Sequence, residues 1–193
     1  MDGPYGRYGV GGAIEGALVN TQSESRPARP WDESRFTAFY EATAPALRRY
    51  LLRVTGDPLM ADDVLQEAYL RLLRTVLPEM DAAALRSYLF QTATRLVYDH
   101  WRRTRRERRA LASLRPEAAP SRAGPPEAAD VMTVFRRLSV RERALLWLAY
   151  VEEYDHREIA RIVGVGERSV RVLLFRARRK MARLLGKRGA RGE

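Results

Sequence analysis

The sequence contains no cysteine, and its only two histidines are His100 and His156. The absence of cysteine excludes disulfides, thiol catalysis and cysteine-ligated zinc. The two histidines lie too far apart in the sequence for an ordinary histidine metal site, so we expect no metal and no cofactor. A Gly-rich phosphate loop and a paired nucleophile and base are also missing, and the sequence therefore does not predict an enzyme.

Long apolar runs are missing as well. No segment approaches the roughly 18 apolar residues that a membrane-spanning helix needs. The first 20 residues lack a basic leader and are interrupted by Glu15, so they do not resemble a signal peptide. Together with the lack of cysteine, this favours a cytoplasmic protein.

Negative charge is scarce, with 24 Asp and Glu against 35 Lys and Arg and a formal net charge of +11. Such an imbalance favours polyanionic partners, because each contact with a phosphate releases counterions. Hydrophobic residues make up 46% of the chain, which is enough for a packed core.

Helical periodicity without β-alternation predicts an all-α fold of two small helical domains. Residues 31–114 form the first domain and residues 131–185 the second, followed by a basic tail over 186–193. Residues 1–30 are rich in Gly, Ser, Pro and Arg, so we expect them to be disordered. Residues 115–130 contain four prolines and predict a flexible linker, since proline removes a backbone donor and biases the preceding residue away from helix.

Several helix starts are marked by capping sequences. Residues 139–142 (SVRE) and 155–158 (DHRE) have the capping-box pattern, in which the first side chain and the fourth satisfy each other's amides. Asp57 precedes Pro58, which places a good N-cap before proline at the first helical position.

Residues 156–185 predict two helices joined at Gly164-Val165-Gly166. The stripe of the second helix that must be buried consists of Val170, Leu173, Leu174, Ala177, Met181 and Leu184. The opposite side of this second helix carries arginines together with Val172 and Phe175. The pair is either a helical corner with a soluble basic surface or a DNA-binding helix-turn-helix. Ten Lys and Arg against two Glu in residues 166–193 exceed what solubility needs, and this favours DNA.

Residues 55–70 contain four acids and no Lys or Arg, in an otherwise basic chain. The expected buried stripe of this helix consists of Ala61, Val64, Leu65, Ala68, Tyr69 and Leu72. Its opposite side mixes acids with Leu59, Leu70 and Leu73, which favours a protein-binding surface. A solvated acidic face and, more weakly, a carboxylate metal site are the alternatives.

Residues 95–109 contain seven arginines, and aromatic residues lie among and just before them. Basic charge beside exposed rings suits nucleic acid, because the charge follows phosphates and rings stack on unpaired bases. The alternative is that most of the rings belong to the core, above all Tyr88 and Phe90.

This order of segments resembles the extracytoplasmic-function (group 4) sigma factors of bacterial RNA polymerase, over residues 36–185. The segment "ADDVLQEAYLR" resembles region 2.2 of that family, and "EIARIVGVGERSV" with the following "FRARRKM" resembles region 4.2. The chain departs from the family at Arg95, where Asn is common, at Gly166, where a Ser cap is usual, and at Ser169, where Thr is common.

The resemblance implies a sigma factor that binds core RNA polymerase and directs promoter-specific initiation. The implied contacts with core polymerase are Asp62, Asp63, Gln66, Glu67 and Leu70. The implied contacts with the −10 element and the melted non-template strand are Arg95, Tyr98, Trp101, Arg102, Arg103, Arg105 and Arg106. The implied contacts with the −35 element of the promoter duplex are Arg168, Ser169, Arg171, Val172, Phe175, Arg176 and Arg179. The resemblance also implies an anti-sigma factor as partner, an association with the nucleoid through polymerase, and no catalytic activity.

Two other functions remain open from the sequence. One is a sigma-like helix-turn-helix regulator that binds DNA without acting through core polymerase. The other is a helical RNA-binding or scaffolding protein that uses its basic faces generically. Two measurements distinguish these two functions from the sigma factor: binding to core polymerase and sequence-specific transcription.

Overall fold

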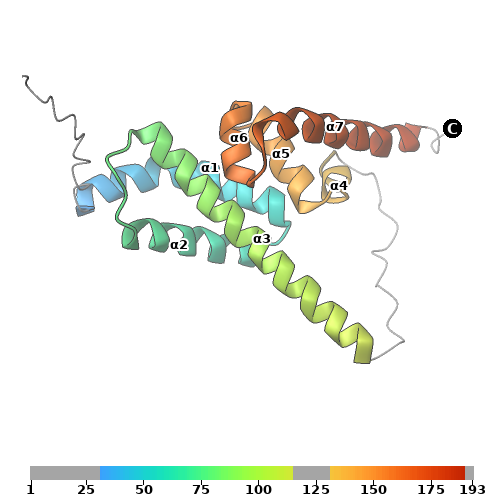
Figure 1. The fold of residues 1–193 in the computed structure, drawn as a ribbon, viewed down its shortest axis with the longest axis horizontal. Coiled ribbons are helices and arrows are strands. Elements are labelled where there is room, and N and C mark those ends of the chain that lie inside the picture. Colours follow the sequence, from blue (N-terminus) through green and yellow to red (C-terminus); the bar gives the residue numbers. More distant parts are fainter. Residues whose placement is uncertain (1–30, 115–130, 190–193) are drawn as a thin grey trace, which may run out of the picture.

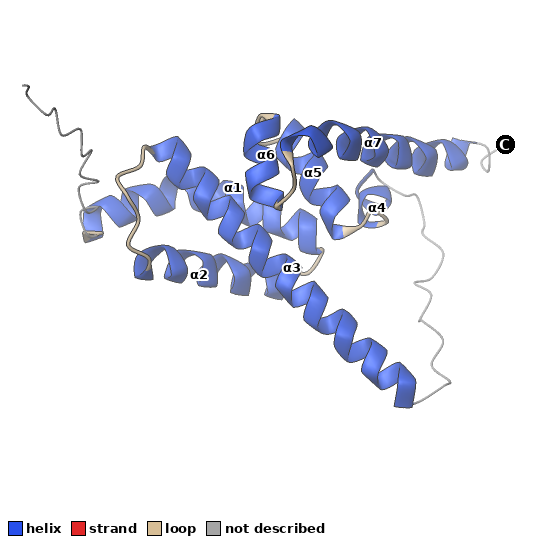
Figure 2. Cartoon of the chain, viewed as in Figure 1, coloured by secondary structure: helices blue, strands red, loops and turns tan. Residues whose placement is uncertain are grey.

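The structure, a computed structural model, describes residues 31–114 and 131–189. Within these residues the chain forms seven α-helices and no β-strand (Figures 1 and 2), so the predicted all-α fold is confirmed. Residues 1–30, 115–130 and 190–193 lie outside the described part. The predictions of a disordered N-terminus and of a flexible linker lie there too, as does the end of the basic tail.

The first half of the fold contains α1 (Glu33–Thr55), α2 (Pro58–Arg74) and α3 (Ala82–Leu114). The chain turns from α1 to α2 at Gly56, whose φ of 73° is the left-handed conformation that glycine adopts without strain. Asp57 then caps α2 by accepting hydrogen bonds from the amides of the first turn, with Pro58 at the first helical position, as the sequence predicts. The long α3 extends well beyond the other helices (Figure 1).

The second half contains four helices: α4 (Val131–Arg136), α5 (Val140–Tyr150), α6 (His156–Val163) and α7 (Glu167–Gly189). Both predicted capping boxes are present. Ser139 and Glu142 satisfy each other's amides at the start of α5, and so do Asp155 and Glu158 at the start of α6. The helix α7 continues past the expected end at residue 185.

One hydrophobic core runs through both halves. In the first half, α2 packs against both α1 and α3, and in the second half α7 packs on α5 and α6. The two halves also pack on each other, because α3 lies against α6 and α1 lies against α5. Tyr154 from the second half meets Phe90 from the first, with ring centroids 5.6 Å apart. The described parts of the two predicted domains therefore share a continuous interior, while the predicted domain bounds stay a prediction.

Polar contacts reinforce this interface, which we call the interdomain seam (α1 and α3 against α5 and α6). The Arg86 guanidinium donates to the carboxylate of Glu152 at 2.5 Å and to the hydroxyl of Tyr154 at 3.2 Å. The same guanidinium lies 5.0 Å from the ring centroid of Phe90. Further along α3, the amide of Gln91 donates to the carbonyl oxygen of Arg161 at 2.7 Å. The seam is therefore a specific interface with matched polar partners.

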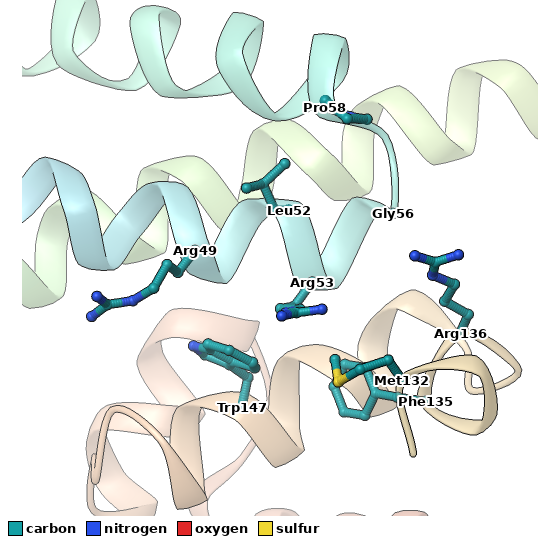
Figure 3. A pocket seen from close by; sticks show the side chains of 9 residues that line it. All are labelled: Arg49, Leu52, Arg53, Gly56, Pro58, Met132, Phe135, Arg136 and Trp147. Carbon is teal, nitrogen blue, oxygen red and sulfur yellow. The ribbon is translucent and has the colours of Figure 1, made fainter. Parts of the chain in front are cut away.

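A small cavity of about 300 Å³ opens at the end of the seam where α1 faces α4 and α5. Its apolar wall is formed by Leu52 from one half and by Met132, Phe135 and Trp147 from the other (Figure 3). The remaining lining residues are Arg49, Arg53, Gly56, Pro58 and Arg136. The two halves thus meet incompletely here and leave an apolar hollow with a basic rim.

Candidate protein and nucleic-acid interfaces

The acidic helix α2 presents leucines to solvent. The six residues buried on α2 are those that the periodicity predicts. On the opposite side Leu59 is 78% exposed, and Leu70 and Leu73 are about two-fifths exposed. Exposed leucines are unfavourable in water, and three on one side of a helix are typical of a surface that a partner covers.

The acids on this outer face of α2 differ in whether an arginine already pairs with them. Asp62 accepts a hydrogen bond from Arg48 Nε at 2.7 Å, which lowers the pKa of the Asp62 carboxyl. Glu67 pairs with Arg71 one turn along the helix. Asp63 and Gln66 are exposed and have no ion-pair or hydrogen-bond partner among the described residues. Asp63 therefore offers the most available negative charge on this face.

The basic part of α3 combines exposed arginines with two aromatic rings, one accessible to solvent and one largely covered. Of the residues expected to contact the −10 DNA, Arg95 and the later arginines are exposed. Trp101 is 37% exposed, so part of its indole is accessible. Tyr98 lies against the second half, where the Arg141 guanidinium is 5.9 Å from its ring centroid. Burial raises the pKa of the Tyr98 hydroxyl to about 12, and this hydroxyl has no hydrogen-bond partner among the described residues.

Two other aromatic residues of α3 belong to the interior. Phe90 is fully buried, and Tyr88 packs partly buried against the core. Their structural role agrees with the alternative that the sequence analysis gave for them. Of the four rings, only Trp101 is substantially open to solvent in this arrangement.

The helices α6 and α7 form a helix-turn-helix. Gly164 ends α6 with a φ of 68°, and its amide bonds to the carbonyl of Ala160. Gly166 does not have a positive φ, so a single glycine makes the turn. The predicted stripe on α7 faces inward, with Val170, Leu174 and Ala177 fully packed.

The outer side of α7 carries the residues expected to contact the −35 DNA. Val172 and Phe175 are about half exposed, and the candidate arginines of this helix lie beside them on the surface. The helix is anchored at its far side by Lys180, which pairs with Glu142 of α5 at 2.7 Å. The outer side is thus free for a ligand while the inner side is fixed.

A groove of about 890 Å³, which the sequence analysis missed, runs between α3 and the start of α5. We call it the arginine groove. Its lining includes six arginines from both halves: Arg102, Arg105, Arg108, Arg136, Arg141 and Arg143. The sequence signal was the "RRLSVRER" segment at 136–143, but its position opposite α3 depends on the seam, which no local pattern encodes.

The described residues contain no group of three or more His, Cys, Asp or Glu side chains arranged to hold a metal ion. Among the same residues, no helix is long and apolar enough to cross a membrane.

Comparisons with known proteins agree on one family. The family model for sigma-70 region 2 matches residues 39–107, and the family model for sigma-70 region 4 matches residues 128–181. The chain is 32% identical over 153 residues to the ECF RNA polymerase sigma factor SigL of Mycobacterium tuberculosis, covering 75% of this chain and 85% of that protein. It is 30% identical over 141 residues to the ECF sigma factor SigM of Bacillus subtilis, covering 70% of this chain and 86% of that protein.

Among solved structures, the fold is similar to the sigma factor RpoE of Bartonella quintana, crystallised with the anti-sigma factor NepR. The TM-score is 0.60 at 20% identity, over 78% of this chain and 96% of that chain. At this identity the likeness supports the arrangement of helices alone.

Proposed function

Because the chain belongs to the extracytoplasmic-function sigma factors of the sigma-70 family, which direct promoter-specific transcription initiation, we propose that three surfaces divide this task. The outer face of α2 binds core RNA polymerase. The basic part of α3 binds the −10 element and the melted non-template strand. The outer side of α7 binds the −35 element.

The proposal for α2 rests on the leucines and acids that its outer face exposes. The contact residues are Asp62, Asp63, Gln66, Glu67 and Leu70. Since Asp63 is unpaired, it can form a new ion pair without first losing one, whereas Asp62 and Glu67 must exchange an existing arginine partner. Leu70 supplies apolar area beside these charges.

The proposal for α7 rests on the helix-turn-helix geometry. The second helix of this motif enters the major groove by its N-terminal turns. Arg168 and Arg171 lie there and suit guanine edges, with Ser169 between them. Val172 and Phe175 suit a thymine methyl or a sugar. The later Arg176 and Arg179 suit phosphates, which position the helix without reading sequence.

The proposal for α3 rests on the row of exposed arginines and on the accessible indole of Trp101. Arginines follow the backbone of a single strand, and an indole stacks on an unpaired base. The contact residues are Arg95, Tyr98, Trp101, Arg102, Arg103, Arg105 and Arg106. Tyr98 is partly covered by the second half, so its contact with DNA requires the seam to open at that point.

Three further properties follow from the family. The protein acts without catalysing a reaction itself, and it reaches the nucleoid through polymerase on promoter DNA. An anti-sigma factor is the third proposed partner, as NepR is for the RpoE of Bartonella quintana.

The test is a fluorescence titration of the full-length labelled protein with purified core polymerase, followed by promoter DNA. We expect saturable binding to core and sequence-specific DNA binding that requires core. A protein that ignores core but binds specific duplex alone is the DNA-binding regulator instead. Binding to RNA and DNA of any sequence with equal affinity identifies the generic basic protein.

A further inference from the structure

The arginine groove has a positive charge that the described residues balance only in small part. Six guanidinium groups line it, and no acidic side chain of the described residues does. Elsewhere in the fold the less exposed cations have carboxylate partners, as Arg86 has Glu152 and Lys180 has Glu142. The groove is therefore an exception within this molecule.

The innermost cation of the groove is Arg143, which is 6% exposed. Its Nε has no hydrogen-bond partner among the described residues, and its only hydrogen bond there joins Nη1 to the carbonyl oxygen of Arg136 at 3.4 Å. Burial lowers the pKa of the Arg143 guanidinium, and the charge of Arg136 lowers it further. A buried charge without a partner is costly, so the site favours any anion that can reach it.

The carbonyl end of α1 also lies near Arg143. The guanidinium lies beside Gly56, where α1 ends. A helix end supplies roughly half of one negative charge. This can offset part of one guanidinium. Arg102 also has the carboxylate of Asp99 at 3.8 Å on the exposed side of α3, but the other four arginines of the groove have no carboxylate partner among the described residues.

The groove also has the size and the chemistry of a ligand site. Its volume lies within the roughly 300–1,000 Å³ typical of small-molecule pockets. Guanidinium forks bind phosphate oxygens in pairs. Trp101 and Tyr98 line the same groove from α3, and Leu138 and Val140 add apolar surface from the other wall. Phosphate-binding arginines beside an accessible indole match a ligand that joins several phosphates to an aromatic base.

We propose that the arginine groove binds a nucleoside polyphosphate, with its phosphates on the arginines of both walls and its base on Trp101. Because α3 forms one wall and α4 with α5 forms the other, the bound ligand joins the two halves and stabilises their packed arrangement. The groove shares four residues with the surface proposed for the −10 element: Tyr98, Trp101, Arg102 and Arg105. Nucleotide binding is measured without polymerase or DNA, so its failure leaves the proposed sigma-factor function untouched.

The test measures binding of ATP and GTP to the full-length protein by titration calorimetry at fixed ionic strength, with inorganic tripolyphosphate as the probe for charge alone. We expect saturable binding of one nucleotide per chain, roughly tenfold tighter than tripolyphosphate because the base stacks. Absence of saturable binding, or tripolyphosphate binding as tightly as both nucleotides, overturns the proposal.

Paired variants locate the site. Arg136→Gln with Arg141→Gln removes two exposed cations of the groove, and Arg157→Gln with Arg178→Gln removes two exposed cations outside it. We expect the groove variant to bind the tighter nucleotide at least about tenfold more weakly, since each charged hydrogen bond is lost. The control variant should bind as the wild type does. Equal weakening in both variants means that the protein attracts nucleotides only by its net charge, and this outcome also overturns the proposal.

A third variant tests whether the site needs both halves. Arg86→Ala weakens the seam without changing a residue that lines the groove. We expect it to lower nucleotide affinity severalfold if circular dichroism shows the helices intact. Unchanged affinity in that folded variant contradicts a ligand held between two walls.

Discussion

Removing the Arg86 side chain tests whether the interdomain seam is held by a specific buried ion pair. Glu152 is the buried partner, with a side chain only 4% exposed. It accepts hydrogen bonds from Arg86 and, at 2.9 Å, from the indole nitrogen of Trp147. The variant Arg86→Met keeps much of the side-chain volume but leaves the carboxylate of Glu152 without its cation.

The expected loss follows from burial. Removing one partner of a fully buried ion pair costs about 3–5 kcal/mol, because the remaining charge is desolvated and uncompensated. The side chain of Arg86 is 31% exposed, so water reaches part of this site and reduces the penalty. We therefore expect Arg86→Met to lower the free energy of unfolding by about 2–4 kcal/mol.

Urea unfolding followed by circular dichroism measures this loss, and a double-mutant cycle with Glu152→Gln isolates the pair. We expect a coupling energy above about 1 kcal/mol for Arg86 and Glu152. The matched control is the exposed pair of Arg48 and Asp62, with side chains 48% and 43% exposed. A cycle with Arg48→Met and Asp62→Asn should give a coupling below about 1 kcal/mol. Equal coupling energies in the two cycles would refute the reasoning.

Four further predictions concern the proposed interfaces. Asp63→Arg combined with Glu67→Arg should weaken binding to core polymerase at least about tenfold, with an unchanged circular-dichroism spectrum; unchanged affinity would exclude α2 as the contact. Arg168→Ala should cost about 1–3 kcal/mol of DNA binding and relax preference at one −35 position, whereas an equal loss on matched and scrambled −35 templates would make α7 only a basic surface. Val172→Glu should abolish −35-dependent transcription without unfolding, because the side chain is about half exposed. Trp101→Ala should slow promoter opening on duplex DNA more than on a pre-melted bubble, and an equal loss on both would indicate damaged folding instead.

The sequence was sufficient for the features that depend on local chemistry. Helix starts were predictable because a capping side chain acts on amides within one turn, as at Ser139 and Asp155. The buried stripe of α2 was predictable because helical periodicity places its members on one side. The outward position of Val172 and Phe175 followed from the same periodicity.

Features that depend on distant segments were not predictable in this way. The packing of α3 against α6 brings Arg86 to Glu152, and nothing in either local pattern requires it. The same packing half-covers Tyr98 and creates the arginine groove from segments that are separated in the sequence. A proline-rich segment between two helical stretches predicted two domains, and neither stretch alone indicates that hydrophobic residues of the two also pack on each other.

The central claim is that this protein makes core RNA polymerase start at specific promoters. Its most direct test is transcription by core polymerase with and without the purified protein on a genomic library, with start sites mapped at single-nucleotide resolution. The account predicts new, discrete start sites that share one −10 element and one −35 element at fixed spacing. These starts should disappear with the Asp63→Arg and Glu67→Arg variant. The same start sites with and without the protein, or new starts with no shared elements, would contradict the account.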